Sequence, residues 1–538
     1  MKRLGVALWL LLAASGIASA DPTTVGFIIL SAIEAAGVTG AATAGTTAVV
    51  SVAGATITVA QIVGTVALIG ASIGAAYGVN ALLNKAPTSK PQDGQITTRQ
   101  PVPPRRRGYG RIKIGGALML SETTTVAGFV GRFQVLALHH GLIDAFEEHW
   151  FSEFAAVLNG SGQVINHFTL GAAPFITLNT RAGLATETAY GTVVSALPAL
   201  WTNDHRGDGI ASAMVQTFQP PNAEDLTTVY PGGLPPPYRA VVRASRVWDP
   251  RDGAQDKDDP STWQWRSNPV LIALDFHRHA DGLGLATYDA TLFTTAAING
   301  DWIPAANICD ETIAGAPRYT CSGLYSLPED EPAGVLAAIL STCDGAMYQR
   351  NDGAIGIRVG KEIAPTVTLD DEHILGYEGF RKGDNVFLAC NEVTAKYTSP
   401  DHDYQETDAQ PWRDEADITA RGQVLSKPLA LQWVTSHSQA RRLMKLAMRR
   451  FNPEWSGRIV TDMAGLAAFN ERYIHLTISE GGLALIDGDF EITSFEILIG
   501  QAITCSIGVS SLDQSAFDWD EGTEAGTPPP VPDGVMGS

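Results

Sequence analysis

The sequence has few cysteines, and no two of them have the C-x-x-C spacing that many metal sites use. The five are Cys309, Cys321, Cys343, Cys390 and Cys505. A structural zinc site is therefore not expected. Cys309 and Cys321 could form a disulfide, although we favour free thiols. Cys505 lies in an alternating apolar run, which is typical of a buried strand.

Sequence motifs for catalysis are also scarce. Neither the metalloprotease pattern H-E-x-x-H nor the phosphate-binding pattern G-x-x-x-x-G-K-[ST] occurs. A pair of acids for glycoside hydrolysis cannot be chosen among 57 acidic residues without a fold. We therefore expect no enzymatic activity and no cofactor.

Basic residues are outnumbered. The chain has 37 Lys and Arg residues against 57 Asp and Glu residues, which gives a formal net charge of −20. This balance argues against a basic surface that binds nucleic acid without sequence preference. It is compatible with DNA passing along an acidic wall, because such a wall repels phosphates.

Charge is missing altogether from 35–84, within an apolar segment that we place at 23–86. Val59–Leu83 is 25 residues long, which is enough for a helix to cross a bilayer. Three glycines at spacings of four would share one face of this helix: Gly70, Gly74 and Gly78. The segment is predicted either to enter a membrane or to form a helical hairpin that other copies bury.

The first 22 residues resemble a secretory signal. Lys2 and Arg3 precede the apolar run Leu4–Ala14, and Ala18-Ser19-Ala20 has the small residues of a cleavage site. The alternative is an uncleaved apolar helix. Residues 87–107 are predicted to be a linker, because they hold five prolines and end in Arg105–Arg107. This arginine run is expected to be a solvated flank, with contact to lipid phosphate, DNA or an acidic partner as the alternative.

The remaining sequence predicts an α+β fold that is predominantly β. Short alternating runs, such as Tyr238–Trp248, indicate a first β domain over 108–260. In the mixed α/β region 261–360, Asn268-Pro269 is typical of a helix start. Further signals there are a helix over Pro332–Cys343 and a hairpin turn at Asn351-Asp352-Gly353.

A second β domain is expected over 361–520, followed by a flexible tail over 521–538 that is rich in Pro, Gly and acid. The strands predicted in this second β domain are Asn391–Pro400, Tyr473–Ser479, Phe490–Leu498 and Ala502–Leu512. Ser436–Phe451 has the pattern of an amphipathic helix. The side chains expected on its outer face are Arg441, Arg442, Lys445, Arg449 and Arg450.

Four clusters have residue types that can bind ligands. The run Asp275-x-His277-x-His279-x-Asp281 could ligate a metal on a strand, but on a helix alternate residues diverge. His139-His140 followed by Asp144 faces a similar objection, because adjacent strand residues point to opposite sides. The adhesive tripeptide Arg206-Gly207-Asp208 is frequent by chance.

The fourth cluster is an acidic loop in 252–259 that is either a calcium site or a solvated surface. Its acids are Asp252, Asp256, Asp258 and Asp259. The nearby glycine comes too early in the loop for an EF-hand.

The order of several motifs resembles the central tail hub, or tip attachment protein J, family of lambda-like long-tailed phages. These motifs are YGRIKIGGAL before ALHHGLID, the strand 238–248 with its DPRDG turn, SNPVLIALDF with a GLG ending, and QARRLMKLAMRR. The resemblance covers about 108–525. It departs from longer members in the apolar N-terminal block and in the lack of receptor-binding fibre modules.

This resemblance implies a virion protein at the tail tip. It implies a homotrimer in which each chain supplies two barrel-like β hub domains around a channel, with the apolar block in the channel or tip. The implied partners are tail tube and distal tail proteins, tip or fibre proteins, the host membrane, and phage DNA that passes without specific binding. The hub would belong to the baseplate, serve host attachment, and open for DNA ejection.

A rival interpretation is a secreted or periplasmic envelope hydrolase with a cleaved signal peptide. It follows from the signal-like start, because a tail hub assembles inside the host cell and an exported copy could not join the particle. A membrane-anchored adhesion or secretion-system component is a third interpretation.

Overall fold

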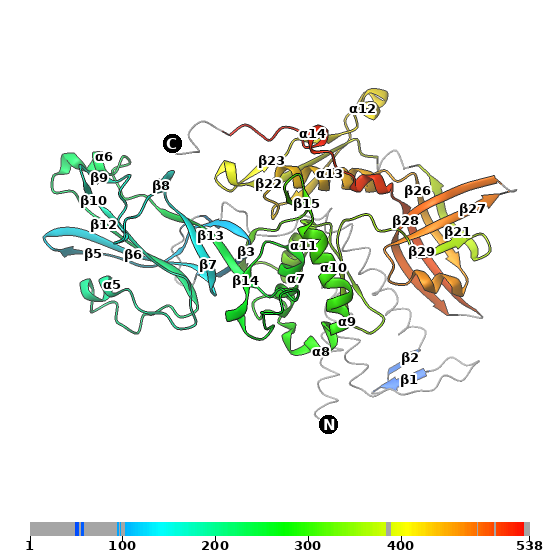
Figure 1. The fold of residues 1–538 in the computed structure, drawn as a ribbon, viewed down its shortest axis with the longest axis horizontal. Coiled ribbons are helices and arrows are strands. Elements are labelled where there is room, and N and C mark those ends of the chain that lie inside the picture. Colours follow the sequence, from blue (N-terminus) through cyan, green and yellow to red (C-terminus); the bar gives the residue numbers. More distant parts are fainter. Residues whose placement is uncertain are drawn as a thin grey trace.

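We describe a computed structural model of the chain, in which the described residues are 49–52, 55–58, 94–95, 97, 103–383, 389–480, 483–499 and 502–531. The protein is mostly β, with 40% strand and 24% helix. Figure 1 shows an elongated arrangement, with a β unit at each end and helices between them. Within the described ranges none of the sheets closes into a barrel, so the prediction of barrel-like domains is wrong in this respect. The larger sheets stay open because the first and last strands of each, such as β11 (Ile176–Arg181) and β5 (Ala117–Val126) or β20 (Thr368–Asp370) and β21 (Ile374–Lys382), do not pair with each other.

Little of the N-terminal block is described. Val49–Val52 (β1) and Ala55–Thr58 (β2) pair as an antiparallel hairpin inside the segment that was predicted to be helical. The signal-like start lies outside the described residues. So do the three glycines of the expected packing face, Gly70, Gly74 and Gly78. Among the described residues, no helix is both long and apolar enough to cross a membrane.

The first β unit consists of two open antiparallel sheets that face each other across one apolar core. One sheet has the order β11-β12-β6-β5, with the bounds Ile176–Arg181, Ile210–Phe218, Phe129–His140 and Ala117–Val126. The other contains β14 (Gln264–Trp265), β13 (Tyr238–Val247), β7 (Ile143–Phe151), β8 (Phe154–Ala156) and β4 (Arg111–Ile114). Shorter elements are β9 (Thr169–Leu170), β10 (Ala173–Pro174), α5 (Gly191–Ala196) and α6 (Leu226–Val229).

The helical middle is built around α7 (Pro269–Arg278), all of whose residues are buried. The predicted start is confirmed: the Asn268 side chain accepts from the backbone N–H groups of Val270 and Leu271, and Pro269 takes the first helical position. The neighbouring helices are α8 (Asp289–Leu292), α9 (Thr295–Ala297), α10 (Ile303–Asp310) and α11 (Pro332–Ser341). Its short strands are β15 (Thr312–Ile313), β16 (Ala316–Pro317), β17 (Gly323–Leu327) and the hairpin β18 (Ala346–Gln349) and β19 (Ile355–Arg358).

One hydrophobic core joins this middle to a later segment of the chain, residues 390–451. The core contains α7 and α11 together with α13 (His437–Phe451) and β22 (Glu392–Ser399). β22 pairs with β23 (Gln405–Asp408), β24 (Trp412–Arg413) and β25 (Ser426–Leu431), and α12 (Glu415–Arg421) lies outside the core. Residues 390–451 therefore pack with the middle, whereas the sequence grouped them with the second β domain.

The second β unit is a six-stranded sheet with the order β20-β27-β28-β29-β26-β21. The bounds in that order are Thr368–Asp370, Tyr473–Glu480, Leu483–Ile499, Ile503–Ser511, Trp455–Thr461 and Ile374–Lys382. The strands predicted around Tyr473, Phe490 and Cys505 are thus confirmed. β28 is long enough to pair with β27 along its first half and with β29 along its second.

The chain then turns back along α13. α14 (Glu521–Glu524) lies beside that helix, with the Ser438 hydroxyl donating to Glu521 at 2.8 Å and Lys445 Nζ donating to Glu524 at 2.6 Å. Residues 521–531 thus contact the body, although the sequence predicted a flexible tail there. Residues 532–538 lie outside the described ranges.

Candidate functional site: charged junctions between the units

The first junction places a strand where the sequence predicted a solvated linker end. Arg105–Tyr109 forms β3, which pairs antiparallel with β17. Arg107 is buried there and donates from Nη2 to Asp275 Oδ2 at 3.1 Å, while the Tyr109 hydroxyl donates to the same oxygen at 2.8 Å. Burial, followed by the Asp275 charge, raises the pKa of Tyr109 and keeps its phenol protonated as a donor.

The two adjacent histidines at the end of β6 point to different partners at this junction. Gly108 N–H donates to His139 Nε2 at 2.9 Å, so the His139 Nδ1–H group can donate to the Gly141 carbonyl at 3.1 Å. Burial lowers the pKa of His139 to about 4, consistent with this neutral form. His140 Nδ1 instead lies 2.7 Å from Asp281 Oδ2. The pair therefore ties the first β unit to both β3 and the end of α7.

The other members of the candidate metal clusters are also engaged separately. His277 Nδ1 lies 2.6 Å from the Ala273 carbonyl one turn back in α7, away from Asp275. Asp144 forms ion pairs with Arg243 and Arg246 at 2.8 Å. His279 is the exception, because its Nδ1 lies 3.9 Å from the Asp281 carboxylate that His140 also contacts. Among the residues that the structure describes, no group of three His, Cys, Asp or Glu side chains is placed to hold a metal ion.

A second junction joins the middle to the six-stranded sheet through four buried charges. Arg450 and Arg472 each bind both Asp344 and Glu491. Arg472 donates to Asp344 at 2.8 Å and to Glu491 at 3.1 Å, and Arg450 donates to Glu491 at 2.8 Å. The prediction that Arg450 lies on an exposed helix face is wrong, because its partners come from elements that lie distant in sequence.

A third junction forms between the first β unit and the turn after β22. Lys113 and Arg239 both bind the Asp403 carboxylate, the latter at 3.2 Å. Gln95 lies in this corner and donates from Nε2 to the Asp403 carbonyl at 2.9 Å. Asp403 and Tyr404 both have positive φ, near 57° and 55°, so the turn is held in a conformation that non-glycine residues adopt infrequently.

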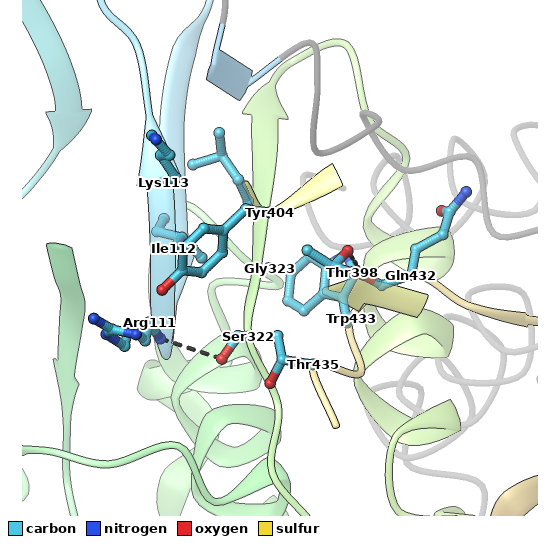
Figure 2. Close-up of a pocket in the computed structure, with 11 residues that line it drawn as sticks. Arg111, Ile112, Lys113, Ser322, Gly323, Thr398, Tyr404, Gln432, Trp433 and Thr435 are labelled. Atoms are coloured by element: carbon cyan, nitrogen blue, oxygen red, sulfur yellow. Dashed lines mark hydrogen bonds between the residues drawn. The ribbon is translucent and has the colours of Figure 1, made fainter. Parts of the chain in front are cut away.

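This junction encloses a small cavity and opens into a cleft. The cavity, of about 30 Å³, lies between Arg111, Ser322 and Trp433, and Figure 2 shows the Tyr404 ring above it with its hydroxyl toward Arg111. That hydroxyl is buried and has no hydrogen-bond partner among the described residues. The cavity is large enough to hold one ordered water, which could form a hydrogen bond with the Tyr404 hydroxyl. The adjoining cleft, of about 470 Å³, has charged walls that include Lys113, Glu148 and Asp401.

The acids of the loop 252–259 mostly satisfy their own backbone. Asp252, Asp256 and Asp259 each accept a hydrogen bond from the backbone N–H group two residues on, at 2.9 to 3.0 Å. Asp258 pairs with Lys257 at 2.7 Å. The acids of the loop thus form hydrogen bonds and an ion pair within the loop itself. Arg206 and Asp208 of the tripeptide form an ion pair with each other at 2.6 Å.

All five cysteines are buried free thiols, which confirms the favoured prediction for Cys309 and Cys321. Cys505 lies buried on β29, as its alternating run indicated. Burial raises the pKa of Cys321, so this thiol stays protonated.

No protein-family model and no curated protein matches the sequence. A solved chain from the virion of a native gene transfer agent particle aligns with a TM-score of 0.51 at 12% identity, over 83% of this chain and 93% of that one. The two chains share a fold. A 43 kDa tail protein of prophage MuSo2 from Shewanella oneidensis aligns with a TM-score of 0.29 at 10% identity, over 76% of this chain and 96% of that one. A tail protein from Neisseria meningitidis MC58 aligns with a TM-score of 0.29 at 9% identity, over 77% and 98%.

The junction residues were not found from the sequence. Arg107, Arg450 and Arg472 carry no local pattern that marks them as buried. Each binds an acid more than a hundred residues away, Asp275 or Asp344, and Glu491, which Arg450 and Arg472 also bind, lies 41 and 19 residues from them. The positions of Asp275 and His139 in singled-out motifs were the nearest signal.

Proposed function

We propose that this protein is a structural component of a phage-like tail, the central hub that closes the tail tube at its host-facing end. It would act as a homotrimer that holds tail tube, distal tail, and tip or fibre proteins, and would open for DNA ejection. The observation that carries the proposal is the fold alignment over 93% of a gene transfer agent virion chain. The motif order that resembles tail hubs supports it independently.

The junctions support a mechanical role. Both β units are fixed to one helical middle by buried ion pairs, and the middle itself is built from two distant chain segments. Such packing transmits displacement between units because interiors are close-packed and resist compression. The acids of the candidate metal clusters take part in such contacts: Asp275 pairs with Arg107, Asp281 with His140, and Asp144 with Arg243. The net charge of −20 suits DNA that passes without binding.

The apolar block 23–86 has a separate place in this proposal. It would occupy the channel or tip and enter the host membrane on ejection, with the three-glycine face packing against another helix. This part rests on the sequence alone, because Gly70, Gly74 and Gly78 lie outside the described residues.

Fractionation of producing cells, with sequencing of the mature N-terminus, tests the proposal against the secreted hydrolase. The tail role predicts that the chain co-purifies with particles and retains residues 1–22. A chain that begins at Asp21 and is recovered from the periplasm would contradict it and favour the hydrolase.

A further inference from the structure

The last described segment belongs to a buried apolar cluster only as far as Phe517. Leu512 and Ala516 are buried in a small cluster with Leu446 and Tyr473, and Phe517 packs against it. From Asp518 to Val531 no described residue is buried. We call residues 518–531 the strap. Figure 1 shows it in red, passing α13 and running on away from the six-stranded sheet.

Charge-assisted hydrogen bonds hold the strap on α13. Lys445 Nζ donates to the Glu524 carboxylate at 2.6 Å and to the Asp518 carbonyl at 2.8 Å. Arg441 Nε donates to the Glu524 carbonyl at 3.1 Å. Further along, Thr527 N–H donates to Gln410 Oε1 at 2.6 Å. Ionic contacts weaken with salt, although less for a partly buried pair such as Lys445–Glu524, whose side chains are 10% and 23% exposed.

One tryptophan adds an aromatic contact. The Trp519 ring lies 6.3 Å from that of Trp412, between centroids, and the Arg442 guanidinium lies 5.6 Å from the Trp519 centroid. Arg441 covers the Trp412 ring at 4.6 Å. The strap thus contacts a surface formed by three cationic side chains and one indole ring. We call Trp412, Arg441, Arg442 and Lys445 the receiver face.

The receiver face is fixed by the core and does not depend on the strap for its shape. Ala440, Leu443 and Met444 of α13 are buried on the opposite side of the helix in the central hydrophobic core. Under the strap, Arg441 and Lys445 are only 8% exposed. Burial lowers the pKa of Arg441, with the Glu524 charge acting in the opposite direction. Without a strap, these cations would be left free to take another acidic, aromatic segment.

We propose that the strap is exchangeable, and that the receiver face of one copy binds the strap of a second copy. The second copy fits because it offers the same four acids, Asp518, Asp520, Glu521 and Glu524, with Trp519 among them. Exchange from Trp519 onward reuses the contacts of Trp519, Glu521 and Glu524, so these acids stay paired. The apolar anchor at Phe517 and the Asp518 carbonyl, which accepts from Lys445 beside that anchor, stay in their own chain and set the hinge. The inference rests on these contacts and does not depend on the tail role.

Cysteine cross-linking in the full chain tests the exchange. Ser438 and Glu521 touch across the interface, and the native cysteines are all buried. A chain with both Ser438→Cys and Glu521→Cys reports docking, through a cross-link by a short bismaleimide. Mixing a Ser438→Cys chain with a tagged Glu521→Cys chain reports exchange, because only an exchanged strap brings the two thiols together. Ser438→Cys mixed with Ser161→Cys, an exposed site in the first β unit, gives the collision background.

We expect the mixed pair to form covalent dimers at least several-fold above that background, and faster as salt is raised. Lys445→Glu should reduce the yield, and Glu524→Lys on the partner chain should restore it. If the double variant cross-links within one chain while the mixed pair stays at background, exchange is wrong. If the double variant does not cross-link at all, the docked strap itself is wrong. Neither result bears on whether the protein is found in particles.

Discussion

Arg107 of β3 and Asp275 of α7 form an ion pair at 3.1 Å whose side chains are 6% and 2% exposed. The pair joins the strand that opens the described body to the helix at its centre. The Tyr109 hydroxyl also donates a hydrogen bond to the Asp275 carboxylate, and the backbone N–H of Gly108 in β3 donates to His139. This contact fixes the first β unit on the helical middle.

Asp275→Asn is expected to destabilise the protein by about 3–5 kcal/mol, because it leaves Arg107 as a buried charge without a counter-charge. Urea unfolding followed by circular dichroism measures the effect. The matched control is Glu454→Gln, whose pair with Lys382 is 67% and 64% exposed and should cost less than about 1 kcal/mol. Equal, small effects of the two substitutions would contradict a structural role for the buried pair.

His277→Phe tests the buried neutral histidine of α7. Burial lowers the pKa of His277 to about 4, whereas in the unfolded chain it is close to 6.5. Between these values the unfolded state binds the extra proton, so His277 makes the wild type lose stability as pH falls from 6.5 to 4. The Phe variant lacks this loss and keeps the ring between Phe293 and Trp302.

The stability of wild type relative to this variant should therefore fall by about 3 kcal/mol over that pH window. Unfolding free energies at pH 7.5 and at pH 4 supply the comparison, and the other buried histidines are common to both chains. A difference that does not change with pH would mean that His277 is not kept neutral by burial.

Gly323→Ala tests the close packing of β17 against the Trp433 indole, beside the cavity of Figure 2. A Cβ atom at Gly323 would lie 2.0 Å from Trp433, so the indole or β17 has to move. We expect a loss of about 1–3 kcal/mol, measured as unfolding free energy. Gly191→Ala is the control, since nothing lies within 4 Å of its Cβ position and its φ is not positive. A neutral Gly323→Ala would show that the indole is loosely packed.

Gly74→Leu tests the membrane part of the proposed role. A large side chain on the three-glycine face should prevent close helix approach, so infection should weaken while tail assembly proceeds. Infectivity per particle, together with counts of complete tails by electron microscopy, measures both. Mutant particles that eject DNA normally would sink the membrane role.

Local signals in the sequence predicted local structure well. The Asn268-Pro269 start of α7, the hairpin turn at Asn351-Asp352-Gly353 and the amphipathic α13 were each encoded within a few residues, and each appears at or near the expected position. Side-chain capping, fixed φ and helical spacing act over one or two turns, so they can be interpreted without a fold.

Pairings between distant segments were not predictable in this way. Arg107 meets Asp275 across 168 residues, and Arg450 meets Asp344 across 106. From composition alone, an arginine beside a proline-rich linker or on a polar helix face is expected in solvent. Only the tertiary fold supplies the acid that makes burial possible. For the same reason, the packing of residues 390–451 with the middle was missed.

Electron microscopy of purified particles, with gold-labelled antibody raised against residues 108–525, tests the central claim most directly. The tail-hub role predicts label confined to the tail tip. Particles that carry no label, with the protein recovered from the cell envelope instead, would contradict the role.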